Sequence, residues 1–529
     1  MQREDRGLRR GFRPVLLVAG VATGIVAGAA ECDQNVDWTV INSAARRQAA
    51  VPIRPGRPGC SPFWNGHSRA FIHPPAFDFK SVNGAKTYRF TLRPEKDEPV
   101  VWTASEPWQG VDAKVWSALA PGYLTLCVEG LDVAQNVVGV AGERKFYRAA
   151  VFCGPYPAAA RDYREAAHRV YAAVFRLPHV QEWLTADEPP GSYDLYCYPS
   201  KILSAMIAAL VRHADAAPVD REKALAIARK MADWLIARSQ PENAPLAFFP
   251  PTYWGDRRKV AVDYAGQNML VYPATAANAF FALADATGEA RYRERAVQIA
   301  RTYLKLQGED GTWPLKVHEK DGRPVRANRM VPDHDLFDLL DRAAAVTGDA
   351  AFSAAAARAF DSILKGPCVT WDWGAQFEDV DPLPPYVNLQ KGVPADVARR
   401  LFAKGGDNAL AREIVDWCED QFVVWSDPVH HMDWQHWKMP TALEQYEYYT
   451  PIDASMADMV GAFSAAFAAT GDRLYLEKAK ALADNLTRNQ RPDGTIPTYF
   501  DSRQGSDWVN CMVYAAERLD ELAATIMVR

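Results

Sequence analysis

Acidic residues stand among aromatic rings in residues 370–379, which read TWDWGAQFED. Aromatic neighbours remove water from a carboxylic acid, and its pKa then rises toward neutrality, where it can exchange protons. Glu378 and Asp379 are therefore our leading candidates for a catalytic acid and base. Trp371 and Trp373 are candidate substrate-binding residues. A solvated acidic loop whose tryptophans belong to the core fits the same pattern.

A second polar segment, residues 332–338, places three aspartates around His334. Asp335 fits a helix cap, which is a common use of aspartate after a loop. Three carboxylates beside one imidazole exceed what a cap requires, and neighbouring carboxylates raise one another's pKa. We therefore predict that His334 and Asp335 are catalytic, with the capping role as the alternative.

Histidines gather in residues 428–437, which read PVHHMDWQHW. One hypothesis is a site for a sugar acid, in which His431 acts beside the sugar carboxylate and Tyr449 protonates the leaving oxygen. A metal site is a second hypothesis, but the spacing matches no established zinc or calcium motif, so we predict no metal and no cofactor. A third hypothesis is that these are ordinary surface and core histidines without a functional role. The candidate substrate-binding residues here are His430, Trp434, His436, Trp437 and Tyr448.

Aromatic residues also crowd residues 248–255, which read FFPPTYWG and run on to Asp263 and Tyr264. Sugar rings present flat C–H faces that pack on aromatic planes, so this segment is either a sugar platform or a plug over the core. Its candidate substrate-binding residues are Tyr253, Trp254, Asp263 and Tyr264. Trp313 and Arg329 complete the predicted set, and Arg326, Arg329 or Lys316 would pair with a substrate carboxylate.

Helical periodicity dominates the chain after residue 157, and it predicts the elements that must position these segments. Twelve helices make six hairpins. The predicted helices span 163–175, 200–214, 221–239, 274–286, 290–307, 335–347, 350–364, 394–402, 409–422, 453–470, 474–489 and 508–526.

An internal repeat supports this organisation. Residues 287–289 (TGE) open a unit with Tyr292, Ala296, Ala300 and Gln307 that closes in DGTWP, and the pattern recurs without a gap 183 residues later. A shorter copy begins at Thr347. Glycine allows the turn between two helices, and the spaced Tyr and Ala form the packed face of the second. One unit cannot bury its apolar face alone, so the copies must stack or close into a ring.

The repeated unit resembles the six-hairpin (α/α) toroid carbohydrate-active enzymes, which include glycoside hydrolases, unsaturated glucuronyl hydrolases and several polysaccharide lyases. The resemblance covers about residues 160–529. It implies a mainly α fold in which residues 156–529 form an (α/α)6 toroid catalytic domain, with the active site in loops at one end of the ring. The fold hosts several chemistries, so it does not select one.

Alternating apolar residues in 85–92 and 121–128 predict strands ahead of the ring. The segments NGAKTYRFTL and LAPGYLTLCVEGLD resemble fibronectin-III-like modules, which implies a small β-sandwich over residues 61–155 that serves as a spacer or docking unit. Residues 32–60 are rich in Arg and Pro and predict a linker or a lead-in strand. Eight cysteines show no CxxC pair, and Cys60–Cys153 or Cys127–Cys153 are candidate disulfides.

Basic residues 6–13 and the apolar run 15–30 predict an export signal over residues 1–31. The expected location is periplasmic or secreted, with an uncleaved membrane anchor as the alternative. The chain has 529 residues, 49% of them hydrophobic, which is typical of a globular protein of two or three domains. A net charge of −5 provides no basic surface for nucleic acid, and the 16 tryptophans favour a carbohydrate partner.

Three functions fit these features. The first is an exported glycoside hydrolase that acts by carboxylate acid/base catalysis on a saccharide that contains uronic acid. The second is a polysaccharide lyase that uses a His/Tyr pair for β-elimination; many toroid lyases carry a further β-domain after the helices, which favours hydrolysis here. The third is a glycan-binding protein or a sugar epimerase. No GxSxG, P-loop, dinucleotide or HExxH motif is present.

Overall fold

The computed structural model describes residues 36–258, 260–381, 383–426, 436–503 and 507–528. The predicted export signal lies outside these ranges. No helix within them is both long enough and apolar enough to span a membrane. Residues 38–529 form one compact unit, which contains a β-sheet region and a ring of helices.

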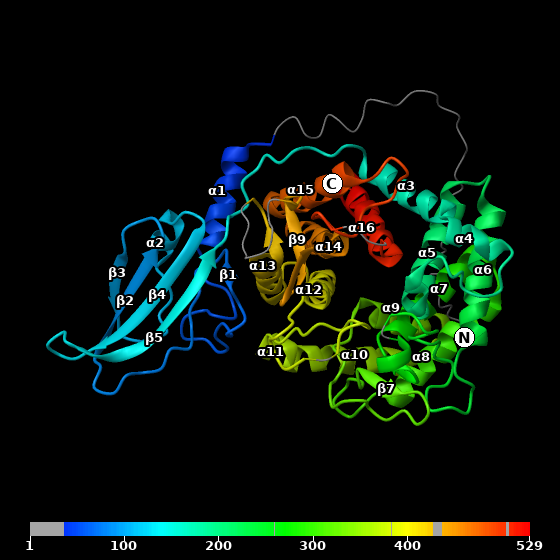
Figure 1. Cartoon of the computed structure of the whole chain (residues 1–529), viewed down its shortest axis with the longest axis horizontal. Coiled ribbons are helices and arrows are strands. Elements are labelled where there is room, and N and C mark those ends of the chain that lie inside the picture. Colours follow the sequence, from blue (N-terminus) through cyan, green and yellow to red (C-terminus); the bar gives the residue numbers. More distant parts are fainter. Residues whose placement is uncertain (1–35, 259, 382, 427–435, 504–506, 529) are drawn as a thin grey trace, which may run out of the picture. The chain divides into compact units, whose positions relative to one another are not determined.

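Twelve helices of the described residues pair into six hairpins, as the sequence predicts (Figure 1). The last helix packs against the first and closes the ring. The pairs are α5 (Pro199–Ala216) with α6 (Arg221–Ala237), α7 (Tyr272–Thr287) with α8 (Ala290–Leu306), α9 (His334–Thr347) with α10 (Ala350–Lys365), α12 (Gly392–Gly405) with α13 (Ala409–Phe422), α14 (Asp453–Thr470) with α15 (Arg473–Asn489), and α16 (Val509–Met527) with α3 (Tyr163–Arg176).

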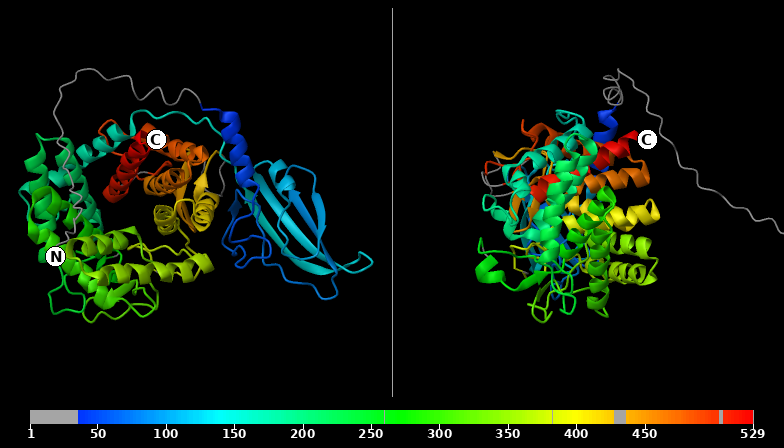
Figure 2. Two further views of the ribbon diagram at one scale, coloured as in Figure 1. Left: turned by 180° about the vertical axis from the view of Figure 1, so that it is seen from behind. Right: turned by 90° about the vertical axis from the view of Figure 1, so that its right-hand side faces the viewer.

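One helix of each hairpin belongs to an inner ring, in which α5, α7, α9, α12, α14 and α16 pack against one another in that order. Helix α16 packs on α5 and completes the circle. The α9–α12 joint is polar, because Arg400 lies 2.9 Å from Asp341 and His334 lies 2.8 Å from Asp396. Figure 2 shows the ring from behind and edge-on. This is an (α/α)6 toroid.

The Thr-Gly turn of the repeat has one geometry in its three copies. Gly288, Gly348 and Gly471 have φ angles of 75°, 70° and 70°, the left-handed region that favours glycine at a helix end. Each preceding threonine donates its hydroxyl to the carbonyl four residues back, at 2.7 Å in all three. The conserved geometry turns each inner helix into its outer partner.

The glutamine of the repeat joins one hairpin to the next. Gln307 donates to the carbonyl of Gly311 in its own DG turn and to that of Ala355 on α10, at 2.8 and 2.9 Å. Gln490 makes the equivalent bonds to Gly494 and to Ala166 on α3. The repeat therefore encodes the contact between neighbouring outer helices, which explains why two units 183 residues apart share it.

The N-terminal region holds one five-stranded sheet in the described residues, so the predicted β-sandwich is not confirmed. The sheet order is β1-β5-β4-β2-β3, antiparallel except that β1 runs parallel to β5. An aromatic cluster packs on this sheet, in the place that a second sheet would occupy in a sandwich. The cluster consists of Phe71, Phe77, Phe146 and the fully buried Trp116. The elements are β1 (Ala70–Phe71), β2 (Thr87–Pro94), β3 (Val100–Ala104), α2 (Ala113–Ala118), β4 (Gly122–Leu131) and β5 (Val137–Arg148).

Helix α1 (Trp38–Ala49) occupies the segment that the sequence predicts as a linker. Ile41, Ala45 and Ala49 are buried at a spacing of four, the stripe of an amphipathic helix that packs near α15. The seven described cysteines carry free thiols, so neither predicted disulfide forms; they are Cys60, Cys127, Cys153, Cys197, Cys368, Cys418 and Cys511.

Short elements connect the hairpins and supply the walls of the site described below. They are α4 (Pro178–Gln181), the 3-10 helices η1 (Glu182–Leu184) and η2 (Asp194–Cys197), the π-helix η3 (Val260–Tyr264), β6 (Gln267–Met269) paired with β7 (Lys316–His318), α11 (Pro367–Thr370), and the sheet of β8 (Val423–Val424), β9 (Thr441–Gln445) and β10 (Tyr448–Pro451).

Candidate active site

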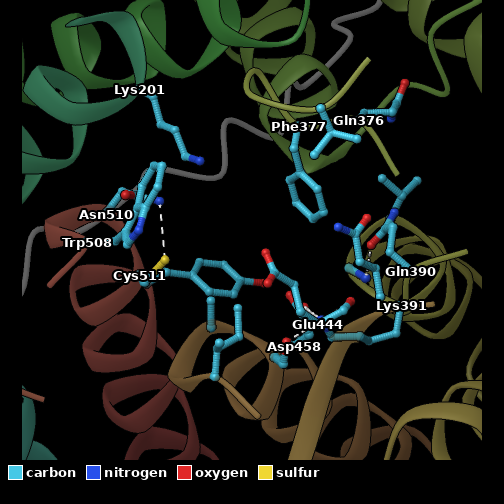
Figure 3. Close-up of a pocket in the computed structure, with 18 of the residues that line it drawn as sticks. Lys201, Gln376, Phe377, Gln390, Lys391, Glu444, Asp458, Trp508, Asn510 and Cys511 are labelled. Atoms are coloured by element: carbon cyan, nitrogen blue, oxygen red, sulfur yellow. Dashed lines mark hydrogen bonds and ion pairs between the residues drawn. The ribbon is translucent and has the colours of Figure 1, made fainter. Parts of the chain in front are cut away.

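A cavity of about 530 Å³ lies at the N-terminal ends of the inner helices, and we name it the central cavity. Lys201, Tyr272, His334 and Asn510 line it from the first turn of α5, α7, α9 and α16. Several helix N-termini therefore face one space, and their partial positive charges favour acidic groups there. Figure 3 shows Lys201, Trp508 and Asn510 on one side, and Lys391, Glu444 and Asp458 on the other.

Glu444 is a carboxyl group that lines the central cavity. It lies on β9, and no hydrogen bond among the described residues reaches its carboxylate. Burial is the main cause that raises the pKa of Glu444 to about 7; Lys391 opposes this, and the charge of Asp379 adds to it. A carboxylic acid with this pKa is partly protonated at neutral pH, which suits a general acid.

Asp379 lines the same cavity from the loop that follows α11. Its Oδ2 atom lies 3.5 Å from the guanidinium of Arg258, and about a third of its side chain (29%) is exposed. Burial and then the neighbouring Glu378 raise the pKa of Asp379 above its ordinary value, while Lys201 and Arg258 limit the rise. Asp379 is therefore a carboxylate close enough to Glu444 to influence its titration.

Glu378 lies beneath the cavity and is fully buried. Its two carboxylate oxygens lie 2.9 and 3.0 Å from Nζ of Lys201, and one also accepts the hydroxyl proton of Tyr272. Its backbone carbonyl accepts from Tyr253 at 2.9 Å and from Lys316 at 3.3 Å. Every acceptor atom of Glu378 is thus engaged, so this residue holds Lys201 in place.

Lys391 ties the strand that carries Glu444 to the inner helices. This buried ammonium donates to the backbone carbonyl of Glu444 at 2.9 Å and to the hydroxyl of Ser455 on α14. Asp458 lies 3.6 Å away on the next turn of α14. Burial lowers the pKa of Lys391, and Asp458 and Glu444 oppose that shift.

His334 is locked in an ion pair at the α9–α12 joint. Its Nδ1 atom lies 2.8 Å from Oδ2 of Asp396. Burial disfavours the imidazolium, but Asp396 and Asp335 outweigh burial and hold the pKa of His334 well above its ordinary value. Asp333 caps α9 through the amide of Leu336, and burial raises the pKa of Asp333 to about 7. The pair with Asp396 therefore favours the imidazolium form of His334.

The aromatic wall of the central cavity includes Trp508, the residue that precedes α16. Its ring stacks on that of Tyr198, with centroids 6.0 Å apart and planes 10° apart. Nζ of Lys201 lies 4.5 Å from the ring centroid. Phe377, Tyr448 and Tyr499 complete the wall.

The structure brings together only part of the predicted catalytic set. Asp379 and His334 line the central cavity, and so does the predicted binding residue Tyr448. Asp335 faces a second cavity of about 590 Å³ further along the inner helices, where Thr275 and Asn278 donate to its carboxylate. Tyr449 is buried beside Tyr446. His431 lies outside the described residues, as do His430 and Trp434.

Most of the other predicted binding residues lie away from the cavity, and we correct those assignments. Trp313, Trp371 and Trp373 are at most 1% exposed, so a sugar could not reach them. Tyr253 and Tyr264 are buried in a stack with ring centroids 5.0 Å apart. Five other predicted binding residues do not line the central cavity. Trp437 is buried, Arg329 pairs with Asp310, and Trp254 packs on Trp234. Asp263 and His436 are exposed elsewhere.

Sequence reasoning missed the residues that the ring brings in from far apart, namely Lys201, Arg258, Lys391, Glu444 and Trp508. Two local signals were present. Glu444 is a single acid in the apolar strand segment TALEQ, and Lys201 follows Pro199 in the first turn of a helix. Neither signal marks the shared cavity, because only ring closure creates it.

The fold and the site define a helical toroid with an acidic and aromatic cavity at one end. No protein-family model matches the sequence, and a comparison with curated proteins finds no match.

Several solved structures are similar. A family 76 glycoside hydrolase from a bovine Bacteroides thetaiotaomicron strain is 11% identical over 85% of this chain and 95% of its own, with a TM-score of 0.44. A D-mannose isomerase is 13% identical over 70% and 100%, with a TM-score of 0.49. An unsaturated glucuronyl hydrolase specific for heparin is 10% identical over 69% and 98%, with a TM-score of 0.45. Likeness at this level assigns neither a family nor an activity to this chain.

Proposed function

We propose that the chain is a glycoside hydrolase that cleaves a saccharide in the central cavity, with Glu444 as general acid and Asp379 as general base. The observation that carries the proposal is the carboxyl group of Glu444, whose pKa is raised to about 7 and which faces the same aromatic-walled cavity as a second carboxylate. Two such carboxyl groups on either side of a glycosidic bond are the requirement for this reaction.

The two residues divide the chemistry. Glu444 gives its proton to the glycosidic oxygen while the bond from that oxygen to the anomeric carbon breaks. Asp379 takes a proton from a water molecule, whose oxygen forms the new bond to the anomeric carbon. The products are two shorter saccharides, one with a new reducing end. Lys201 and Arg258 favour the charged form of Asp379, which is the form that accepts that proton.

Tyr449, the proton donor of the elimination hypothesis, is buried and does not line the central cavity, which favours hydrolysis. His431, the histidine of that hypothesis, lies outside the described residues. His334 is a poor substitute for the base, because its ion pair with Asp396 favours the imidazolium. Among the cations that the sequence offers for a sugar carboxylate, Lys316 and Arg326 lie near Asp381, and Arg329 pairs with Asp310. We therefore propose a saccharide as the substrate and do not require that it contain uronic acid.

A panel of neutral and acidic saccharides tests the proposal directly. We expect reducing ends to accumulate with at least one member, without the ultraviolet absorbance of an unsaturated sugar. Growth of both signals together would identify a lyase. A panel on which neither signal grows would count against both hydrolysis and elimination. Export by the predicted signal is a separate proposal that this assay does not address.

The pH dependence of kcat/KM is expected to be bell-shaped. Glu444 must be protonated to act, so the rate should fall about tenfold per pH unit above about 7, the pKa to which burial raises this group. Asp379 must be ionised, so the rate should also fall at acid pH, with a midpoint above the ordinary aspartate value of 3.8. A rate that rises through pH 7 and stays high would require a different proton donor.

Trp508, which lines the central cavity, is expected to bind a sugar ring. Replacing Trp508 by Ala should raise KM by roughly tenfold, about 1.4 kcal/mol of lost contact, and change kcat less. Trp254→Ala is the matched control, because that ring is 41% exposed but lies outside the cavity. Equal KM values for the two variants would remove Trp508 from the binding site.

A further inference from the structure

The strand that carries Glu444 belongs to a hairpin whose two turn residues do not line the central cavity. Strands β9 and β10 place Glu444, Gln445 and Tyr448 in the cavity wall, and the turn between the strands is Tyr446–Glu447. Glu447 has a φ angle of 62°, which is unfavourable for a residue other than glycine. A turn in this conformation persists only when surrounding contacts hold it.

Residues of the N-terminal region hold this turn. The hydroxyl of Tyr446 lies 3.0 Å from that of Ser68, and it also donates to the amide oxygen of Gln421 on α13. The carboxylate of Glu447 lies 3.1 Å from the guanidinium of Arg69. That guanidinium also covers the ring of Tyr449, at 5.7 Å from its centroid. Both residues of the turn are therefore bound by two consecutive residues, Ser68 and Arg69.

Ser68 and Arg69 are themselves fixed to the rest of the molecule. They lead into β1, whose Ala70 carbonyl accepts a bond of 3.0 Å from Gln421. The amides of Ile72 and His73 donate to one oxygen of Asp420 on α13, at 2.6 and 2.7 Å. The carbonyl of Ser68 accepts from Arg144 of β5, so the same segment is anchored in the sheet.

We propose that the N-terminal β-sheet region is a brace for the catalytic hairpin, in which Ser68 and Arg69 are positioning residues for Glu444. This inference rests on the proposed function, because it assigns the brace to the proposed acid. It replaces the spacer or docking role expected from the sequence. Only Gln445 and Tyr446 lie between Glu444 and Glu447, so movement of the turn displaces the acid. A displacement of about 1 Å at a catalytic group can cost roughly a hundredfold in rate.

Hydrogen–deuterium exchange on the full chain tests the brace without an assay of activity. In the double variant Ser68→Ala/Arg69→Ala, amides of the β9–β10 hairpin should exchange faster than in the wild type, while those of α5 and α7 should not change. Arg89→Ala is the matched control, because Arg89 makes an ion pair of 2.8 Å with Glu129 elsewhere in the same sheet. Arg69→Ala alone, which removes an exposed side chain, repeats the test should the double variant fold poorly. Unchanged exchange in the hairpin would overturn the brace.

Kinetics test the consequence for the acid. The double variant should lose between about tenfold and a hundredfold in kcat, with KM nearly unchanged. The alkaline limb of its pH profile should move below 7, because water that reaches a loosened hairpin removes the burial that raises the pKa of Glu444. Arg69→Lys, which keeps the charge, should restore most of the rate.

If the hairpin of the double variant exchanges faster but its kcat and pH profile are unaltered, Ser68 and Arg69 hold the hairpin without positioning Glu444. That result would overturn their role as positioning residues. A wild-type chain that hydrolyses no saccharide would instead refute the proposed function. The exchange experiment would still decide whether the brace exists.

Discussion

Replacing Glu444 by Gln is expected to lower kcat by roughly a thousandfold, with KM within about twofold of the wild type. Glutamine has nearly the same shape as glutamic acid but cannot donate a proton at neutral pH. The side chain makes no hydrogen bond among the described residues, so the substitution removes its charge interaction with Lys391 but breaks no hydrogen bond there. The loss should therefore appear in turnover and not in folding.

The pH profile of the Glu444→Gln variant separates a proton donor from a residue that only contacts substrate. We expect the residual rate to lose the alkaline limb near pH 7, because the group that titrates there is gone. A substrate whose leaving group needs no proton should be cleaved by the variant at a rate close to that of the wild type. Glu294→Gln, on the exposed face of α8, is the control and should match the wild type throughout. Full activity of Glu444→Gln would exclude the assigned role.

Replacing Glu378 by Gln is expected to reduce the free energy of unfolding by about 3 kcal/mol or more. Lys201 would lose the carboxylate that lies 2.9 Å from its ammonium and would remain largely buried without a compensating charge. Burial of an unpaired charge costs more than the pair contributes. Thermal or urea unfolding of the purified chain measures the change.

A double-mutant cycle tests the cause of that loss. Lys201→Met removes the orphaned charge, so Glu378→Gln/Lys201→Met should be more stable than Glu378→Gln alone. Additive losses would show that the pair is not coupled. Sequence analysis ranks Glu378 as a leading catalytic candidate, whereas its buried pairing makes it a support for Lys201. A folded Glu378→Gln variant as stable as the wild type and without activity would restore the catalytic assignment.

The ring could be predicted because its information is local and repeated. Periodicity locates twelve helices, and the Thr-Gly turns recur with the same left-handed glycine. The architecture of the N-terminal region was not predictable in the same way, since alternation identifies β2 and β4 but does not say whether a second sheet packs on them. Helix α1 was missed although Ile41, Ala45 and Ala49 form a readable stripe, because its arginines and the following prolines resemble a linker.

The site was only partly predictable, because it depends on which loops the ring brings together. Asp379 was identified from its aromatic neighbours, and its burial explains that signal. The same signal misplaced Trp371 and Trp373, since aromatic residues beside acids pack into a core as readily as they line a cavity. Glu444 has no acidic neighbour in its strand. Its pKa depends first on burial and then on Lys391 and Asp379, which are distant in sequence.

A crystal structure of the Glu444→Gln variant with a bound oligosaccharide is the most direct test of the role assigned to the central cavity. The substitution should stop turnover while leaving the cavity intact, so the uncut substrate should remain. We expect a sugar ring on Trp508 and a glycosidic oxygen within hydrogen-bond distance, about 2.6–3.2 Å, of the side chain at position 444. A saccharide bound outside the cavity, or one whose glycosidic oxygen faces a different residue, would contradict the assignment.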